Sequence, residues 1–538
     1  MEEDADFTQV TMSQRMTDKP SSSLQPHHYY NAPSGKKRAD FGSQPHGKLF
    51  NDPVHNHFRL DPVSMKIVDT PQFQRLADLK QLGCTYYVFR GASHARLEHS
   101  LGVGHLAYTL ADSIYKMQRE ELDISRSDVK CAEIAGLVHD LGHGPYSHVF
   151  DRVMNKMGTH WVHEQMSVNI LDDILADNVH DISEADLSED EIKHVKAMIT
   201  SEKGGQPPPK GKRWLYEIVA NNRNGLDVDK YDYLQRDALY CNVKTSVDIN
   251  RIMTLAKVLD DEICYKYTEF QNVYEVFATR ARMFRSVYLH KKARAVEHMI
   301  VDALLAAEPT LRLAERTEDP REFVRLDDSI IKVIENWGVA RPGFGALAMD
   351  ADEDGETSIT NAQAILQRLR RRDLYKFVDE FIVPREELDA DSWKEPSAQD
   401  IVSHSSDSSV KLDPDNIIID VAKVDLTKGS QNPMDSVSFF HHAESTEKVS
   451  LKANQISTMF PLSNLEKHCR IYSRDSSPAV VGATQEAFRR WLEQRFGDRV
   501  QLCTPARRLR NELPPMTRLE GNPRKRSLDG AFIQSLNR

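Results

Sequence analysis

The segment AGLVHDLGHGPYSHVFD, residues 135–151, places three histidines and two aspartates in an apolar frame. Burying titratable groups without a partner is costly, so such groups normally serve a metal, a substrate or one another. His139 and Asp140 are adjacent near the end of a predicted helix, where their side chains diverge by about 100°. They can therefore offer one nitrogen and one oxygen to a shared metal. A hydrolytic metal site uses three or four protein ligands, so further ligands must come from elsewhere in the chain.

Two other segments carry side chains that could complete such a site. Upstream, ASHARLEHSLGVGH contains His99, and downstream, NGLDVDKYDYLQRDALY puts Asp229, Tyr233 and Asp237 at i, i+4 and i+8 on one helix face. An ion-paired solvated face would have the same spacing, but such faces usually carry Lys and Glu, whereas this helix combines Asp, Tyr and Arg with apolar residues. Cations for a polyphosphate and rings for a sugar or base lie nearby in sequence: Arg96, Lys230, Arg280, Lys291, Tyr233 and Tyr288.

These side chains need a helical scaffold, and the chain from Asp61 to about Leu311 has a helical pattern of apolar residues. After about Pro384 the pattern becomes β-branched or alternating in IIIDVAKVDL and DSVSFF, and EAFRRWLEQRF is helical again. We therefore predict a mostly α fold, with a catalytic helical core at 46–384. A smaller C-terminal α+β lobe, for regulation or oligomerisation, is expected at 385–503.

Both ends of the chain have the composition of tails. Residues 1–45 are rich in Ser, Pro, Gln, His and Asn and predict a disordered segment, and residues 504–538 predict a basic, proline-containing tail. Lys36-Lys37-Arg38 and Arg524-Lys525-Arg526 are candidate nuclear-import signals, although such short runs are common on solvated tails.

The bulk properties restrict the class of protein. The net charge of −11 argues against a dedicated nucleic-acid-coating protein, although local basic sites for phosphates remain compatible with it. The six cysteines are scattered, and MEEDADFTQV has no secretory-leader pattern, so we expect an intracellular protein, nuclear, cytoplasmic or both. No run of eighteen apolar residues predicts a membrane span. Walker and Rossmann glycine patterns are absent, so phosphates would be bound by side chains and metal.

The order of these residues resembles the H…HD…D signature of the HD-domain phosphohydrolases. Longer segments resemble the SAM-and-HD-domain deoxynucleoside triphosphate triphosphohydrolases of animals, over about residues 47–500. They are DTPQFQRL (69–76), YYVFRGASHARLEHSLGVGHLA (86–107), IAGLVHDLGHGPYSHVFD (134–151), HEQ (163–165), LYEIVANNRNGLDVDKYDY (215–233) and NPMDSVSFF (432–440). We expect no counterpart of the SAM domain, since only a short polar segment precedes Lys48.

The resemblance implies an HD helical core and a reaction in which water attacks the α-phosphate of a dNTP, giving deoxynucleoside and inorganic triphosphate. A transition metal such as iron or zinc would be held by His99, His139, Asp140 and Asp229, and Mg²⁺ would accompany the phosphates. The implied proton-transfer groups are His148 as general acid at the leaving 5′-oxygen, assisted by Asp151, with His163 and Glu164 adjoining.

The resemblance also implies a substrate pocket. Phosphates would be contacted by Arg96, His143, Lys230 and Arg280, and the deoxyribose by Gln81, Leu82, Tyr233, Asp237 and Tyr288. Packing of Tyr288 and Leu82 against the sugar would leave no room for a 2′-hydroxyl. Leu289 departs from the family, where glutamine follows the tyrosine, so one sugar or base contact is expected to be missing.

Activation by a nucleotide, GTP or a dNTP, and assembly into a homotetramer are further implications. The first activator site would comprise Lys48, Asn51, His57, Asp69 and Gln74, and the phosphates of a second nucleotide would contact Arg251 and Lys291. Ala77 stands where the family has an arginine that reads guanine, and Thr268 replaces a lysine of the second site. Regulation by some nucleotide is expected, whereas its specificity for guanine stays open.

Two alternatives use the same residues. Another HD phosphohydrolase, acting on nucleoside monophosphates, cyclic nucleotides or a polynucleotide, would keep the four ligands and change the pocket. A non-catalytic nucleic-acid-binding regulator would use the HD core as a scaffold. The complete ligand series and His148 argue against the scaffold, because a scaffold has no physical need for unpaired acid, base and metal ligands together.

Overall fold

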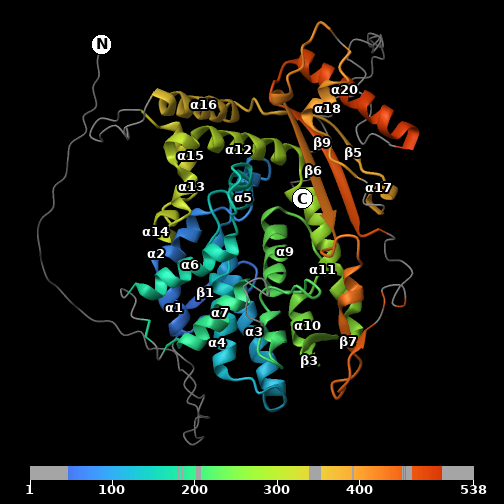
Figure 1. The fold of residues 1–538 in the computed structure, drawn as a ribbon. Helices are drawn as coiled ribbons and strands as arrows, with labels where there is room; N and C mark the ends of the chain where they lie inside the picture. The colour runs from blue at the N-terminus through green and yellow to red at the C-terminus, as the bar shows by residue number, and fades with distance from the viewer. Residues whose placement is uncertain are drawn as a thin grey trace, which may run out of the picture. The chain divides into compact units, whose positions relative to one another are not determined.

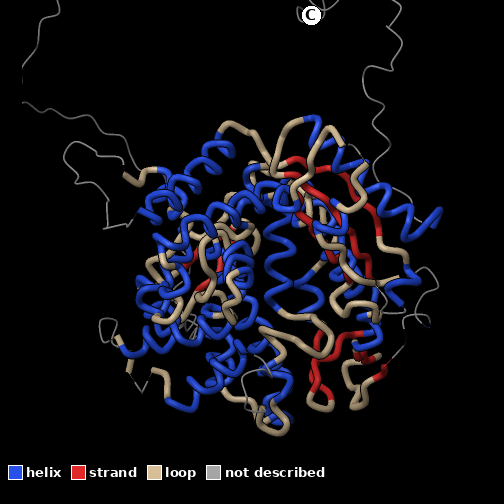
Figure 2. Tube along the Cα trace, turned by 45° about the horizontal axis from the view of Figure 1, so that its top comes forward, coloured by secondary structure: helices blue, strands red, loops and turns tan. Residues whose placement is uncertain are grey.

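The computed structural model describes residues 47–177, 182–183, 186–200, 208–338, 353–389, 393–406, 408–450, 452, 455 and 463–499. The predicted tails and both basic runs lie outside these residues. Helices make up most of the described fold, and the strands of the two larger sheets lie at one side of it (Figure 2).

Helices from residue 62 to residue 311 build the core around the segment 135–151 (Figure 1). They are α1 (Pro62–Val68), α2 (Pro71–Gln74), α3 (Arg96–Leu122), α4 (Arg126–Val138), α5 (His148–Lys156), α6 (His163–Ala176), α7 (Glu189–Thr200), α8 (Arg213–Tyr216), α9 (Val228–Tyr240), α10 (Ile249–Thr254), α11 (Phe270–Met283) and α12 (Lys291–Leu311). Short helical turns connect them: η1 (Arg75–Asp78), η2 (Gly83–Tyr87), η5 (Tyr267–Glu269) and the π-helical turn η6 (Phe284–Tyr288).

Local capping explains where two of the site-bearing helices begin. At the start of α4, the Ser125 hydroxyl accepts from the Asp128 N–H at 3.2 Å, and the Asp128 carboxylate accepts from the Ser125 N–H at 2.8 Å. At the start of α9, the Asp227 carboxylate accepts from the Lys230 N–H at 3.0 Å. Each cap satisfies backbone donors that have no partner within the helix, and so defines its first turn.

Helices α3 and α4 cross at Gly104 and Gly136, which have no side chains to hold the two backbones apart. A Cβ at Gly136 would lie 2.9 Å from the Val103 carbonyl oxygen and 3.0 Å from the Gly104 Cα, both backbone atoms. A Cβ at Gly104 would meet Leu137 at 2.6 Å. Close backbone approach therefore sets the separation of these helices, which carry His99 and precede His139.

We expect Gly136→Val to destabilise the protein by about 1–3 kcal/mol, because the added carbons have only backbone to displace. The measurement is the midpoint of thermal unfolding. Gly482→Ala is the matched control: a Cβ at Gly482, in α20 (Pro478–Phe496), meets nothing within 4 Å. This control should unfold at the same temperature or a higher one, since alanine favours helix. An unchanged midpoint for Gly136→Val would show that the crossing is not tight.

The remaining helices of the first 370 residues extend the core. They are α13 (Leu313–Arg316), α14 (Pro320–Phe323), α15 (Ile330–Glu335) and α16 (Glu353–Arg370). Helix α16 lies along α12 (Figure 1), burying Ile359, Ala362, Leu366 and Leu369. These four follow helical spacing, which explains why this face of α16 packs rather than faces solvent.

Within the described residues, three sheets accompany the helices. A hairpin pairs β1 (Leu49–Asp52) with β2 (Asn56–Arg59), and a four-stranded sheet has the order β3 (Ala256–Leu259), β4 (Glu262–Lys266), β7 (Ser438–Phe440), β8 (Val449–Ser450). The third sheet is antiparallel, with the order β5 (Lys376–Ile382), β9 (Leu465–Ser473), β6 (Ile417–Asp425). Because β7 pairs with β4, the C-terminal part of the chain adds strands to the core.

The third sheet forms the α+β lobe with three helices, α17 (Arg385–Asp389), α18 (Ala398–Val402) and α20, and short turns η7 (Pro414–Asn416), η8 (Pro433–Ser436) and η9 (Gly497–Arg499). Its own hydrophobic cluster includes Phe381, Ile471, Phe488 and Trp491. The predicted fold class, a mostly α core with a smaller α+β lobe, is confirmed. Strand β5 lies before residue 385, within the range predicted for the core, so the sheet of the lobe includes residues from that range. The domain limits stay a prediction.

Two findings bear on the environment of the protein. No helix within the described ranges is both long enough and apolar enough to span a membrane. The five described cysteines are free and buried, and burial raises the pKa of the Cys131, Cys241 and Cys264 thiols to about 12. These thiols therefore stay protonated and unreactive at neutral pH.

Candidate active site

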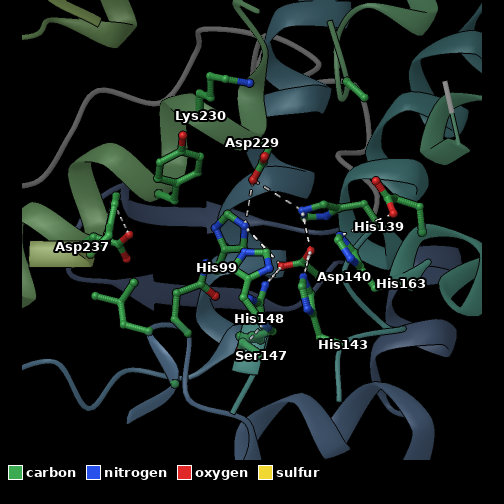
Figure 3. Close-up of a pocket in the computed structure, with 18 of the residues that line it drawn as sticks. His99, His139, Asp140, His143, Ser147, His148, His163, Asp229, Lys230 and Asp237 are labelled. Atoms are coloured by element: carbon green, nitrogen blue, oxygen red, sulfur yellow. Dashed lines mark hydrogen bonds and ion pairs between the residues drawn. The ribbon is translucent and has the colours of Figure 1, made fainter. Parts of the chain in front are cut away.

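The four predicted metal ligands meet in one cavity, although helix α3, the turn after α4 and helix α9 supply them (Figure 3). His99 Nε2 lies 3.1 Å from Asp229 Oδ1 and 3.5 Å from Asp140 Oδ2. His139 Nε2 lies 3.3 Å from Asp140 Oδ1 and 3.6 Å from Asp229 Oδ1. One ligand atom from each of His99, His139 and Asp229 falls within 4.8 Å of the other two. Two imidazole nitrogens and two carboxylates therefore converge on a single point.

The orientation of the two imidazoles suits a metal ion. His139 donates from Nδ1 to the Gly136 carbonyl at 2.8 Å, while its Nε2 is buried without a hydrogen bond. His99 donates from Nδ1 to Asp232 at 2.7 Å, which directs its Nε2 toward Asp229 and the other ligands. A hydrogen bond at one ring nitrogen fixes the tautomer and exposes the lone pair of the other, as in metal-bound histidines. The residues present therefore fit a divalent transition metal with nitrogen and oxygen ligands.

Asp232 is a supporting residue whose role the sequence did not indicate. It is fully buried, accepts from His99, and also accepts from Arg236 at 2.8 Å and His55 at 2.6 Å. Gly102 makes room for it, because a Cβ there would lie 2.0 Å from Asp232 Oδ1. The available signal was its position three residues after Asp229, on the turn of α9 that faces α3.

The charges of the cluster act together. Burial by itself would lower the pKa of His99, but hydrogen bonds to Asp229 and Asp232 outweigh burial and raise the pKa to about 10. Burial would raise the pKa of Asp229, whereas His139 and His99 hold that pKa far below its usual value. A site that holds its carboxylates ionised and attracts a proton to His99 is one that favours a cation.

Of the predicted proton-transfer residues, His148, His163 and Glu164 line the same cavity, and Asp151 lies beside His148 without lining it. His148 Nδ1 is 2.9 Å from Asp151 Oδ2, and the other Asp151 oxygen accepts from Trp161 at 3.0 Å. His163 stacks on His143 with centroids 4.1 Å apart, and its Nε2 lies 3.6 Å from Glu164. The Asp151 carboxylate thus orients His148, whose side chain is 71% exposed in this structure.

A strained turn presents His148. Tyr146 and Ser147 have φ values of 60° and 58°, which non-glycine residues rarely adopt. Ser147 is held on both sides, since it accepts from Arg96 Nε at 2.8 Å and donates to the Lys80 carbonyl at 2.8 Å. A strained turn of this kind persists only where surrounding contacts hold it in place. Here the turn directs the start of α5 toward the cavity.

One side of the cavity has the composition expected for a sugar. Tyr288 donates to Asp237 at 2.6 Å, and His94, which the sequence did not single out, donates to Asp237 at 2.8 Å. Gln81 lines the cavity with a buried Oε1 that has no hydrogen-bond partner in this structure. Leu82, Tyr233 and Leu289 line it as well.

The cavity measures about 720 Å³, which is within the range of small-molecule sites. Of the predicted phosphate-binding residues, Arg96, His143 and Lys230 line it. Arg280 does not; it donates to the Asp425 carboxylate at 2.7 Å and lies over the Phe284 ring. Residues that the sequence did not indicate also line the cavity: Arg152, Asn221, Asn222, Arg294, Thr427 and Lys428.

None of the seven predicted activator residues lines this cavity. Asn51 and His57 face each other across the β1–β2 hairpin, with Lys48 just before it. Asp69 ends α1, and Gln74 at the end of α2 donates to the Val68 carbonyl at 2.8 Å. Arg251 and Lys291 are both ion-paired, with Glu269 at 2.7 Å and Glu380 at 2.5 Å respectively. Ala77, where the family has an arginine, lies in η1 and is exposed.

Comparison with known proteins places this geometry in a family. The HD domain model matches residues 96–237, which include all four clustered ligands. A deoxynucleoside triphosphate triphosphohydrolase SAMHD1 homolog of Dictyostelium discoideum is 37% identical over 456 residues, covering 84% of this chain and 82% of the relative. The SAMHD1 enzymes of Gallus gallus and Homo sapiens are 35% and 34% identical, each over 83% of this chain and over 75% and 74% of their own lengths. The chain therefore belongs to the family of SAMHD1 deoxynucleoside triphosphate triphosphohydrolases.

Proposed function

We propose that the protein is a metal-dependent hydrolase that converts a dNTP to a deoxynucleoside and inorganic triphosphate. One observation carries the proposal: the His99, His139, Asp140 and Asp229 cluster shares a single cavity with His148. Ligands for a metal and a proton donor that a carboxylate orients are together the parts that a phosphoester hydrolase needs.

The metal ligands and the proton donor have separate tasks. Held by His99, His139, Asp140 and Asp229, an iron or zinc ion would supply Lewis-acid activation at neutral pH, and Mg²⁺ would accompany the phosphates. His148 gives its proton to the 5′-oxygen as the bond to the α-phosphorus breaks, because Asp151 holds the opposite ring nitrogen. His163 and Glu164 adjoin this pair, and Arg96 and Lys230 offer positive charge to the phosphates.

Selection of deoxyribose rests on Tyr288 and Leu82. The Tyr288 hydroxyl is held by Asp237, which His94 also contacts, so the ring has one fixed position. A ring that is fixed against the sugar excludes a 2′-hydroxyl by steric conflict. Leu289 lines the cavity with an apolar side chain and offers no hydrogen bond to sugar or base.

The proposal extends to regulation: nucleotide activation, a homotetramer, control of the cellular dNTP pool, and residence in the nucleus, the cytoplasm or both. The proposal of nucleotide activation is supported by the β1–β2 hairpin, which brings Asn51 and His57 together beside Lys48.

Ala77→Arg should make activity more dependent on GTP, because an exposed arginine in η1 would restore a donor pair for guanine. The check is the initial rate of dATP hydrolysis with and without GTP for wild type and variant. Ala77→Lys is the charge-matched control, as it adds the charge without the planar pair of donors. Equal GTP dependence in wild type and Ala77→Arg would show that residue 77 does not read guanine.

The direct test of the reaction is a product analysis. Incubation with dATP, dGTP, dCTP or dTTP, with and without GTP, should release inorganic triphosphate and one equivalent of deoxynucleoside. Release of pyrophosphate, or of orthophosphate alone, would assign the chain to a different phosphohydrolase reaction. The corresponding ribonucleotides serve as the control and should react far more slowly.

A further inference from the structure

A turn of the C-terminal lobe enters the catalytic cavity. Strand β6 ends at Asp425, and the next residues include Thr427 and Lys428, both of which line the cavity. Lys428 Nζ donates to the Asn222 carbonyl at 2.5 Å, on the loop that leads into α9. The lobe therefore contributes a cation to a site that the core helices otherwise build.

Hydrogen bonds fix the shape of this turn. The Asp425 carboxylate accepts from the Thr427 N–H at 3.0 Å and from the Gly429 N–H at 3.2 Å, so it brackets Lys428. Arg280 donates to the same carboxylate and to the Asp425 backbone carbonyl, each at 2.7 Å. In this structure Arg280 thus supports the turn that carries Lys428 instead of lining the cavity itself.

Packing fixes the position of the turn against the core. Gly225 and Thr427 are so close that a Cβ at residue 225 would lie 2.3 Å from the Thr427 methyl carbon. Thr427 has a φ of 108°, a conformation that β-branched residues rarely adopt. The absence of a side chain at Gly225 is therefore what allows the turn to seat and places Lys428 at the cavity wall.

Lys428 differs from the other cations of the cavity in its partners. Arg96 pairs with Asp140, Lys230 with Asp227 at 2.9 Å, Arg152 with Glu297 at 2.8 Å, and Arg294 with Asp420. Across the described residues, Lys428 has no carboxylate within ion-pair distance, and its recorded contact is the Asn222 carbonyl. An ammonium without a counter-charge in a cavity is available to an anionic ligand.

The place of Lys428 along the cavity indicates which part of a nucleotide it would meet. Helix α9 carries Asp229 and Lys230 at its first turn and Asp237 two turns later (Figure 3). Asp237 and its partner Tyr288 form the side of the cavity expected for the sugar, here called the sugar wall. Asn222 precedes this first turn, so Lys428 lies at the end of α9 opposite to the sugar wall. A nucleotide with its sugar at Asp237 and its α-phosphate at the metal ligands would direct its terminal phosphate toward Lys428.

We propose that Lys428 binds the terminal phosphate of the substrate and thereby makes the enzyme prefer triphosphates to diphosphates. This inference rests on the proposed function, since it assumes that the metal cluster receives the α-phosphate. A diphosphate with the same sugar and α-phosphate positions would end before Lys428 and gain nothing from its charge.

The test compares Lys428→Ala with wild type, using dATP as substrate and dADP as competitive inhibitor. KM for dATP should rise about ten- to a hundred-fold, as expected for the loss of one charge-assisted hydrogen bond, while kcat changes little. The inhibition constant of dADP should stay the same. Lys428→Arg should recover most of the affinity for dATP, and Lys411→Ala, at an exposed lysine of the same lobe, should match wild type.

Two results would overturn the inference. One is an unchanged KM for dATP in Lys428→Ala. The other is an equal weakening of dATP and dADP, which would mean that Lys428 acts on the whole pocket and not on the terminal phosphate. Failure of the proposed function is distinguishable from both, because wild type itself would then release no triphosphate from dATP. Unchanged thermal unfolding midpoints for the variants would exclude loss of folding as the cause.

Discussion

Replacing His139 with alanine and Asp140 with asparagine should remove the bound transition metal and reduce turnover to background. The two residues supply two of the four atoms that converge in the cluster, and His139 Nε2 has no other hydrogen-bond partner. Asparagine is chosen at residue 140 because Asp140 also pairs with buried Arg96, and its amide oxygen keeps an acceptor there without the charge. Loss of ligands should exceed the roughly 10–100-fold effect of altering a residue that only orients a ligand.

The measurements are metal content by elemental analysis and triphosphate release from dATP. His160→Ala is the matched control: His160 is exposed, lies only three residues before His163, and does not line the cavity. It should keep the metal and full activity. Retained metal in the double variant would mean that the ligand set is different, whereas lost metal with retained turnover would mean that the chemistry does not need it.

Substituting His148 with alanine should lower kcat about 10²–10⁴-fold, the usual contribution of a positioned general acid. The metal should remain bound, because His148 contacts Asp151 and not the His99, His139 and Asp229 cluster. KM for dATP should change little if the proton is transferred only as the bond to the leaving oxygen breaks. Steady-state kinetics together with metal content on the same preparation check both expectations.

Asp151→Asn separates positioning from proton donation. The amide oxygen can still accept from His148 Nδ1, but the charge that stabilises the imidazolium is gone, so the loss in kcat should be smaller than for His148→Ala. Equal kcat in wild type and His148→Ala would remove His148 from the reaction and point to another donor.

The order and residue types of the candidate metal ligands are properties of the sequence itself. His99, His139-Asp140 and Asp229 span 130 positions, and their order, together with the longer segments that surround them, indicated the family. Their residue types dictated nitrogen and oxygen ligation, and the helical spacing of α9 put Asp229 and Asp237 on one face. Such inferences succeed because they depend on chemistry and local periodicity, which are properties of short segments.

What the sequence did not predict are the hydrogen-bond and ion-pair partners of individual side chains. The sequence predicted Arg280 as a phosphate ligand but gave no sign of its partner Asp425, which only the folded lobe brings within 2.7 Å of the guanidinium. His94 and Asp232 are unremarkable in the sequence, and each matters because a hydrogen bond connects it to a residue more than 130 positions away. Lys428 begins the segment KGSQNPM, whose residue types predict a turn and no ligand-binding role.

By itself, the sequence therefore determined the family and the mostly α fold, and it predicted the ligand types and a proton donor. The tertiary structure alone decided which cations are already paired and which one is free within the described cavity, how the imidazoles are oriented, and that a turn of the C-terminal lobe reaches the core. The physical reason is that these properties are distances between side chains far apart in the chain. Close packing at Gly136, against backbone, and at Gly225, against the Thr427 side chain, contributes to those distances, and no local pattern encodes them.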